Sequence, residues 1–228
     1  MTADEQKRAV GEAAAALVEN GMTVGLGTGT TAAFFVEALA RRQLDLRCVS
    51  TSNATADLAV RLGLKVIDLD DVGVIDLTVD GADEIAPDLS LIKGAGAAML
   101  REKLVWESSR RCVAIADASK RSDSLGRAPL PIEVVSFGHA TTAKRLSAAL
   151  QGCGIDIEPK LRLRDDAPLI TDGGNVIYDA ACGYIPDPAA LGVALKAVTG
   201  VVEHGLFIGL AERALLATDE GVVTLHPR

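Results

Sequence analysis

TVDGADEIAPDLSLIKGAGAAMLREK, residues 78–103, is the stretch of this sequence that decides the fold class. The apolar run Val74–Val79 predicts a buried strand, and Gly81 after it marks a turn. Asp80 and Asp83 therefore stand on the turn at the end of that strand. In an open α/β sheet, the turns at such strand ends line the crevice in which ligands bind.

A basic group and a further acidic group follow within the same stretch. The run Leu89–Ile92 delivers Lys93 to the flexible segment Gly94-Ala95-Gly96. An Ala- and Leu-rich segment comes next, and it is predicted to be a helix that carries Glu102. Carboxylates, an ammonium group and flexible backbone are thus all presented at the ends of predicted elements. We interpret the stretch as one wall of a ligand site.

Strands and helices are predicted to alternate on both sides of this stretch. Helical periodicity and capping residues predict helices within 2–20, from Ala32, and over 54–62. Apolar runs predict strands over 22–26, 46–49, 65–69 and 112–116. Because such alternation implies a parallel sheet, we expect an α/β fold with a Rossmann-like open parallel sheet.

A second, smaller unit is predicted after a Pro-rich break at 127–131. Residues 128–200 read as a strand, a helix, two strands joined by the turn 172–175, and a final helix, which is the order of a small α+β (ferredoxin-like) domain with an antiparallel sheet. Later apolar runs are expected to return to the first sheet, so that 1–127 and 201–228 form the Rossmann-like catalytic domain. Aspartates of the smaller unit are expected to be turn and surface residues: Asp165, Asp166 and Asp179.

Composition and charge restrict the partners that this protein can bind. The net charge is -8 and the pI ≈ 4.9, whereas binding to nucleic acid or an anionic membrane depends on a basic surface. We therefore expect neither nucleic acid nor a membrane as partner, and an anionic ligand must find a local positive site. The four dispersed cysteines indicate buried thiols in a reducing compartment. Without an apolar signal core or an apolar run of about 18 residues, the expected location is the cytoplasm.

The segment Gly27-Thr28-Gly29-Thr30-Thr31 has the composition of a phosphate-binding turn between a strand and a helix. Glycines let the backbone approach an anion, hydroxyls and amides donate to it, and the dipole of the following helix favours negative charge. The segment is not the dinucleotide fingerprint, which would need glycine at Thr30, and it has no lysine to complete a P-loop. A purely structural turn is the alternative, but the row of hydroxyls favours a cradle for a monophosphate or a sugar.

Two lysines could supply the local positive charge. Lys120 follows the predicted strand 112–116, and Lys7 lies on the apolar stripe of the first helix. The alternatives are a solvated loop lysine and a lysine stem that covers the core with its head in water. Near a hydroxyl-rich turn, both could instead hold an anion.

Four motifs in this order and spacing closely resemble the type A ribose-5-phosphate isomerases: GLGTGTTAAFFVEAL, VDGADEI, LIKGAGAAMLREK and IADASK. The resemblance extends over the whole chain. It includes PLPIEV at the entry to the smaller unit, the hairpin TDGGNVIYD and the return segment GLF.

The resemblance implies roles for the matched positions. The residue matching Glu102 is the proton acceptor of that family. Substrate contacts in the family fall on positions that match Thr28, Gly29, Thr30, Thr31, Asp80, Gly81, Ala82, Asp83, Lys93, Gly94, Ala95, Gly96 and Lys120. Thr30 stands where serine is usual, and Ala95 stands where a third glycine is usual. The hydroxyl survives at the first position, and alanine is tolerated at the second wherever the backbone angles are not restricted to glycine.

The implied reaction interconverts D-ribose 5-phosphate and D-ribulose 5-phosphate through a cis-enediolate, in the non-oxidative pentose phosphate pathway, with no cofactor and no metal. One carboxylate can take a proton from one carbon and return it to the neighbouring carbon. Glu102 suits this role, because apolar neighbours on its helix would raise its pKa by desolvation. An exposed glutamate paired with a basic neighbour is the alternative, since the helix is apolar over much of its circumference.

The remaining groups are expected to assist the base and to hold the substrate. Lys93 could stabilise the negative charge of the enediolate, while Lys7, Lys120 and the Thr30–Thr31 turn would hold the phosphate. Asp80 or Asp83 could open the sugar ring and hold hydroxyl protons, or both could serve mainly as turn formers. The resemblance also suggests a homodimer or a dimer of dimers.

Two other functions were weighed against the isomerase. A non-catalytic sugar-phosphate sensor, as found in some transcription regulators, would need a DNA-binding segment, and no helix-turn-helix fits before the first strand. A related sugar-phosphate deaminase or lactonase would keep the phosphate turn but would need other catalytic groups.

Overall fold

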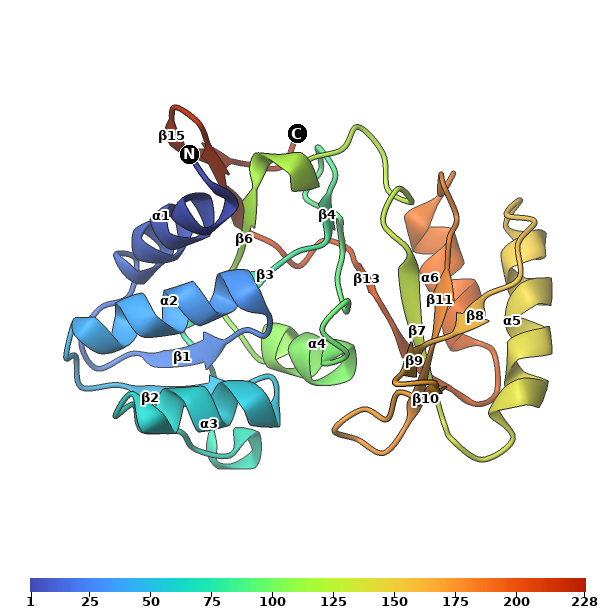
Figure 1. Cartoon of the computed structure of the whole chain (residues 1–228), viewed down its shortest axis with the longest axis horizontal. Helices are drawn as coiled ribbons and strands as arrows, with labels where there is room; N and C mark the ends of the chain where they lie inside the picture. Colours follow the sequence, from blue (N-terminus) through green and yellow to red (C-terminus); the bar gives the residue numbers. More distant parts are fainter.

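A six-stranded sheet forms the centre of the larger part of the molecule (Figure 1). The computed structural model describes residues 1–228. The strands of this sheet are β1 (Thr23–Leu26), β2 (Arg47–Ser50), β3 (Leu77–Gly81), β6 (Cys112–Asp117), β14 (Arg213–Thr218) and β15 (Gly221–Leu225). Their order is β15-β14-β6-β3-β1-β2, and every pair is parallel except β14 with β15. The predicted α/β class with a mostly parallel sheet is confirmed.

Helices cover both faces of this sheet, because alternate residues of each strand point to opposite sides. In β6, Val113 and Ile115 join a cluster with helices α1 (Ala3–Ala15), α2 (Thr30–Arg41) and α3 (Asn53–Arg61). Cys112 and Ala114 of the same strand join a second cluster with helix α4 (Met99–Glu107). The predicted capping box is present at the start of α1, where Thr2 and Glu5 bond to each other's backbone amides. None of the helices is both long and apolar enough to span a membrane.

A second sheet has four antiparallel strands in the order β12-β7-β11-β8. The strands are β7 (Leu130–Val134), β8 (Lys160–Leu161), β11 (Val176–Ala180) and β12 (Val201–His204). Helices α5 (His139–Gly152) and α6 (Pro188–Lys196) pack with them in a separate apolar cluster. A short hairpin, β9 (Leu163–Arg164) with β10 (Ala167–Pro168), follows β8. The separate cluster supports the proposed division into two units, which lie side by side along the long axis in Figure 1.

A small third sheet connects the two parts. It contains β4 (Glu84–Ile85), β5 (Leu91–Ile92) and β13 (Leu206–Phe207), in the order β13-β5-β4. The apolar run before Lys93 therefore forms a strand of this sheet and not of the parallel one. Two 3-10 turns complete the chain: η1 (Leu69–Asp71) and η2 (Ala118–Lys120).

The predicted strand over 65–69 is wrong. Only a single bridge forms there, between Val66 and Cys48 of β2. Asp68 then accepts a hydrogen bond from the Asp70 amide and begins η1, which turns the chain away from the edge of the sheet.

The expected return to the first sheet at Val201 is also wrong. Strand β12 (Val201–His204) pairs with β7, so residues 201–204 belong by their hydrogen bonds to the smaller sheet. The next strand, β13, pairs with β5. The chain rejoins the parallel sheet only at β14, because the pairing partners of β12 and β13 lie outside that sheet.

Gly205 lies where the returning chain crosses from the second sheet to the third. Its amide donates to the Pro131 carbonyl at 2.8 Å, and its carbonyl accepts from the Lys93 amide at 2.9 Å. A Cβ atom at this position would lie 2.3 Å from the Lys93 carbonyl oxygen and 2.7 Å from Pro131. Only glycine fits at this crossing without movement of the backbone that carries Lys93.

We expect Gly205→Ala to lower the free energy of unfolding by about 1–3 kcal/mol, the usual effect of forcing an atom into a filled space. Urea unfolding followed by circular dichroism measures this. Gly73→Ala is the matched control, because a Cβ atom there meets nothing within 4 Å. Equal stability of the two variants would contradict the crowding at Gly205.

Candidate active site

The candidate site lies at the carboxyl ends of β1 and β3, the strands at which the sheet reverses its direction of growth. From β1 the chain continues to β2 on one side, and from β3 it continues to β6 on the other. Loops that leave two such strands diverge and open a crevice between them. A cavity of about 540 Å³ occupies this position, and only 3 of its 18 lining residues are hydrophobic. The cavity therefore suits a small polar ligand.

The cavity brings together all but one of the residues predicted for the site. The predicted residues that line it are Lys7, Thr28, Gly29, Thr30, Thr31, Gly81, Ala82, Asp83, Lys93, Gly94, Ala95, Gly96, Glu102 and Lys120. Four further lining residues were not predicted: Ala3, Gln6, Asp117 and Ser119. Asp117 and Ser119 stand at the end of β6 beside Lys120, so their position at a strand end was the signal that could have found them.

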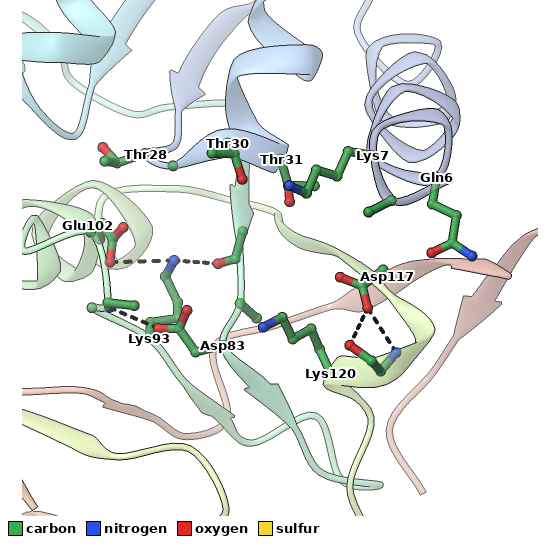
Figure 2. Close-up of a pocket in the computed structure, with 18 residues that line it drawn as sticks. Gln6, Lys7, Thr28, Thr30, Thr31, Asp83, Lys93, Glu102, Asp117 and Lys120 are labelled. Atoms are coloured by element: carbon green, nitrogen blue, oxygen red, sulfur yellow. Dashed lines mark hydrogen bonds and ion pairs between the residues drawn. The ribbon is translucent and has the colours of Figure 1, made fainter. Parts of the chain in front are cut away.

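Lys93 is the centre of a buried charge cluster at one end of the cavity (Figure 2). Its Nζ atom lies 3.0 Å from Asp80 Oδ2 and 3.5 Å from Glu102 Oε2, and it donates to the Gly81 carbonyl at 2.5 Å. The side chain of Lys93 is only 2% exposed. Burial acts to lower the pKa of Lys93, but the negative charges of Asp80 and Glu102 outweigh it and raise the pKa. Lys93 is therefore held as an ammonium ion.

Glu102 is presented from the first turn of α4 and is 3% exposed in its side chain. Burial and the nearby Asp80 carboxylate raise the pKa of Glu102 to about 8, against the opposing effect of Lys93. Its Oε2 atom has no hydrogen-bond partner within the chain. The alternative of an exposed glutamate with a local basic partner is wrong, because the packing of α4 turns Glu102 toward the cavity. A carboxylate of this kind is available to exchange a proton with a ligand.

Asp80 is the one predicted site residue that does not line the cavity, and it is fully buried. Its Oδ1 atom accepts hydrogen bonds from the amides of Thr28 at 3.0 Å and Gly81 at 2.7 Å, while Oδ2 pairs with Lys93. Burial raises the pKa of Asp80, while the Lys93 ammonium and the two amides act in the opposite direction and favour the ionised carboxylate. The end of β3 directs the Asp80 side chain beneath the loops that carry Thr28 and Gly81, away from the cavity. The predicted contact of Asp80 with the substrate stays a prediction.

Asp83 faces the cavity and fixes the glycine-rich loop. Its Oδ2 atom accepts a hydrogen bond from the Ala95 amide at 2.9 Å (Figure 2). Gly94 has a φ of 108°, a conformation that favours glycine, whereas Ala95 has no positive φ. The structure thus confirms that alanine is tolerated at position 95.

The threonine-rich turn divides its hydroxyls between the protein and the cavity. The Thr28 hydroxyl lies 2.6 Å from that of Thr51 and donates to Ser52 at 2.9 Å, so it is used within the protein. Thr30 and Thr31 begin α2 and line the cavity. No side chain caps α2, so the first amides of this helix stay available to an anion.

Lys7 and Lys120 approach the cavity from the side opposite Glu102. Lys7 extends from α1 toward Thr31, and Lys120 extends inward from η2 (Figure 2). Two ammonium groups and the start of a helix therefore lie at one end, and the Lys93 cluster lies at the other. The chain has no group of three or more His, Cys, Asp or Glu side chains arranged to hold a metal ion.

Comparison with known proteins gives a consistent result. The family model "Ribose 5-phosphate isomerase A (phosphoriboisomerase A)" matches residues 47–221, and the model of the DeoR C terminal sensor domain matches residues 2–68. The chain is 63% identical over 227 residues to a ribose-5-phosphate isomerase A of Caulobacter sp. (strain K31), with 100% of both chains covered.

Solved structures agree with the sequence comparison. The ribose 5 phosphate isomerase A of Neisseria gonorrhoeae superposes with a TM-score of 0.92 at 35% identity, covering 100% of this chain and 98% of that one. A D-ribose-5-phosphate isomerase in complex with phospho-erythronic acid gives the same TM-score of 0.92 at 35% identity, covering 99% and 100%. The chain belongs to the ribose 5-phosphate isomerase A family.

Proposed function

We propose that the chain interconverts D-ribose 5-phosphate and D-ribulose 5-phosphate by proton transfer through Glu102. The observation that carries this mechanism is the position of Glu102. This buried carboxylate lies at the end of the cavity opposite Lys7 and Lys120, with its Oε2 atom 3.5 Å from Lys93 Nζ. With the phosphate at the two lysines, carbons 1 and 2 of an open-chain pentose would lie beside Glu102.

In the proposed reaction, Glu102 removes the proton from carbon 2 of the aldose. The electron pair of that bond forms a double bond between carbons 1 and 2, and the carbonyl oxygen becomes an oxyanion. The proton of the carbon-2 hydroxyl passes to the oxygen on carbon 1, a transfer that we assign to Asp83. Glu102 then returns its proton to carbon 1 as the carbonyl forms at carbon 2. One carboxylate serves both steps, because the enediolate exposes both carbons on the same side.

Lys93 would stabilise the charge that develops on the enediolate oxygens. Its ammonium group is already fixed by Asp80 and the Gly81 carbonyl, so little reorganisation is needed when the oxyanion forms. Asp80 thus acts as the support of Lys93. Of Asp80 and Asp83, only Asp83 lines the cavity, and we assign to it the opening of the sugar ring and the movement of hydroxyl protons.

The phosphate would bind between Lys7, Lys120 and the start of α2. Thr30 and Thr31 contribute hydroxyls there, and the free amides of the first helical turn add donors. These groups supply the local positive charge that an anionic ligand needs on a chain with a net charge of -8. The substrate phosphate is held by a few fixed groups and not by a basic surface.

The match to the sensor domain makes a non-catalytic sugar-phosphate sensor the second candidate. The matched residues 2–68 contain Lys7 and the phosphate turn, which a sensor would share. Asp83, Lys93 and Glu102 lie outside that match, and a sensor has no need of a buried base of raised pKa.

The proposed homodimer or dimer of dimers stays a prediction.

Glu102→Gln is expected to lower kcat by at least about a hundredfold, because the amide cannot accept the carbon-bound proton. Conversion of ribose 5-phosphate is followed with and without excess chelator, and the wild type should be indifferent to the chelator. Glu107→Gln is the matched control, an exposed glutamate on the same helix. Near-normal turnover by a folded Glu102→Gln protein would exclude Glu102 as the base.

The pH profile should report the Glu102 carboxylate. Since the base acts only when ionised and its pKa is raised to about 8, kcat/KM should fall as the pH decreases through about 8 and level off above it. Initial rates between about pH 6 and pH 10 measure this limb. In Glu102→Gln the residual rate should lose the limb, and an unchanged limb in that variant would assign it to another group.

Lys120→Ala is expected to raise KM for ribose 5-phosphate roughly 10- to 100-fold, the effect of losing about 1.5–3 kcal/mol from a hydrogen bond to a charged group. Turnover of unphosphorylated ribose, measured with excess enzyme, should change little, since ribose lacks the phosphate that Lys120 would bind. Lys144→Ala, at an exposed position of α5, is the control. An equal loss with both substrates would contradict a role in holding the phosphate.

A further inference from the structure

Arg162 is a residue of the smaller unit that reaches the glycine-rich loop of the active site. It stands between β8 and β9, and its side chain is 15% exposed. Its Nη1 atom donates to the carbonyls of Gly94 at 2.9 Å and Ala95 at 3.1 Å. No other side chain of that unit donates to this loop.

Asp179 holds the guanidinium of Arg162 in a forked pair. Arg162 Nε donates to Asp179 Oδ2 at 2.7 Å, and Nη2 donates to Oδ1. Asp179 lies in β11, which pairs with both β7 and β8. Asp179 is therefore a strand residue and not the expected turn residue, and its side chain is 26% exposed. A planar fork fixed to the middle of a sheet is a rigid support.

The direction of these hydrogen bonds determines which way the loop amides point. In a trans peptide the carbonyl and the N–H of one peptide unit point in opposite directions. The Gly94 carbonyl shares its unit with the Ala95 amide, and the Ala95 carbonyl shares its unit with the Gly96 amide. Because Arg162 draws both carbonyls toward the smaller unit, both amides are turned toward the opposite side.

The observed contacts agree with this geometry. The Ala95 amide donates to Asp83 Oδ2 at 2.9 Å, on the cavity side of the loop. The Gly96 amide makes no hydrogen bond within the chain, and Gly96 lines the cavity. It is therefore a free donor aimed at the space in which a substrate hydroxyl or oxyanion would lie. The Gly94 carbonyl also accepts the Ala97 amide at 3.0 Å, whereas the Ala95 carbonyl has Arg162 as its one donor within the chain.

We propose that Arg162 and Asp179 are positioning residues of the reaction, through which the smaller unit fixes the 94–96 loop and aims the Ala95 and Gly96 amides at Asp83 and at the substrate. This inference rests on the proposed isomerase function. Neither residue touches the substrate. Their effect is exerted on the orientation of Asp83 and on a backbone donor beside Lys93.

Arg162→Met is expected to lower kcat for ribose 5-phosphate about 10- to 100-fold, since a displacement of about 1 Å at reacting groups costs up to about a hundredfold. Inhibition by inorganic phosphate should be unchanged, because the lysines and α2 that bind phosphate lie at the other end of the cavity. Arg164→Met, an exposed arginine two residues further along, is the matched control and should leave both quantities unchanged. A general structural defect would alter phosphate inhibition as well.

Two further variants separate positioning from folding. Asp179→Asn should give a smaller loss of kcat, and Arg162→Met/Asp179→Asn should be no worse than Arg162→Met alone, because the two residues act through one interaction. Arg162→Lys should recover only part of the rate, since one ammonium cannot bind the carboxylate and both carbonyls. If Arg162→Met does not fold, Asp179→Asn and Arg162→Lys carry the test with the same expected order.

Wild-type kcat in Arg162→Met, or a loss confined to phosphate inhibition, would overturn the positioning role. Additive losses in the double variant would overturn it as well. These outcomes are distinct from failure of the proposed function, which would appear as a wild type inactive on ribose 5-phosphate or as an unimpaired Glu102→Gln protein.

Discussion

The buried ion pair of Lys93 with Asp80 is the interaction on which the site depends. A charge moved out of water is stable only if it is paired and hydrogen-bonded, and removing one partner of such a pair is strongly destabilising. Lys93 meets this condition through contacts from separate parts of the chain: Asp80 and the Gly81 carbonyl at the end of β3, and Glu102 from α4. The backbone at Lys93 is bonded in turn to Gly205. The elements that form the site are therefore held together by the same charge that would stabilise an enediolate in the proposed reaction.

The packing that stabilises α4 also sets the chemistry of Glu102. Trp106 of α4 packs edge-on against Phe207 of β13, with 5.5 Å between the ring centroids. The Lys93 ammonium lies over both rings. This apolar environment excludes water from the Lys93 cluster and raises the pKa of Glu102. Burial thus gives Glu102 the basicity that the proposed proton transfer would use, and it would strengthen the interaction of Lys93 with a developing oxyanion.

The smaller unit is joined to the site by hydrogen bonds to backbone groups. Glu84 of β4 is fully buried. It accepts hydrogen bonds from the Gly126 amide at 3.0 Å and the Ala128 amide at 3.1 Å, at the start of the connection between the units. Arg162 of that unit donates hydrogen bonds to the carbonyls of Gly94 and Ala95 in the glycine-rich loop. The larger unit therefore supplies the groups that would contact the substrate, while contacts from the smaller unit constrain how their loops lie.

The sequence by itself determined the class of the fold, because strand ends and glycine-rich turns are local patterns. Of the 15 residues that it predicted for the site, 14 line one cavity, while their roles stay predictions. Only the tertiary structure decided what depends on pairing between distant segments. It turned Asp80 beneath the loops and Asp83 into the cavity, although both stand at the carboxyl end of β3. It placed β12 in the smaller sheet. It also brought Arg162, held by Asp179, to a loop about 70 residues earlier in the chain. A carboxylate at a strand end looks the same in sequence whether it is buried as a support or exposed to a ligand, since burial is set by side chains that the local pattern does not contain.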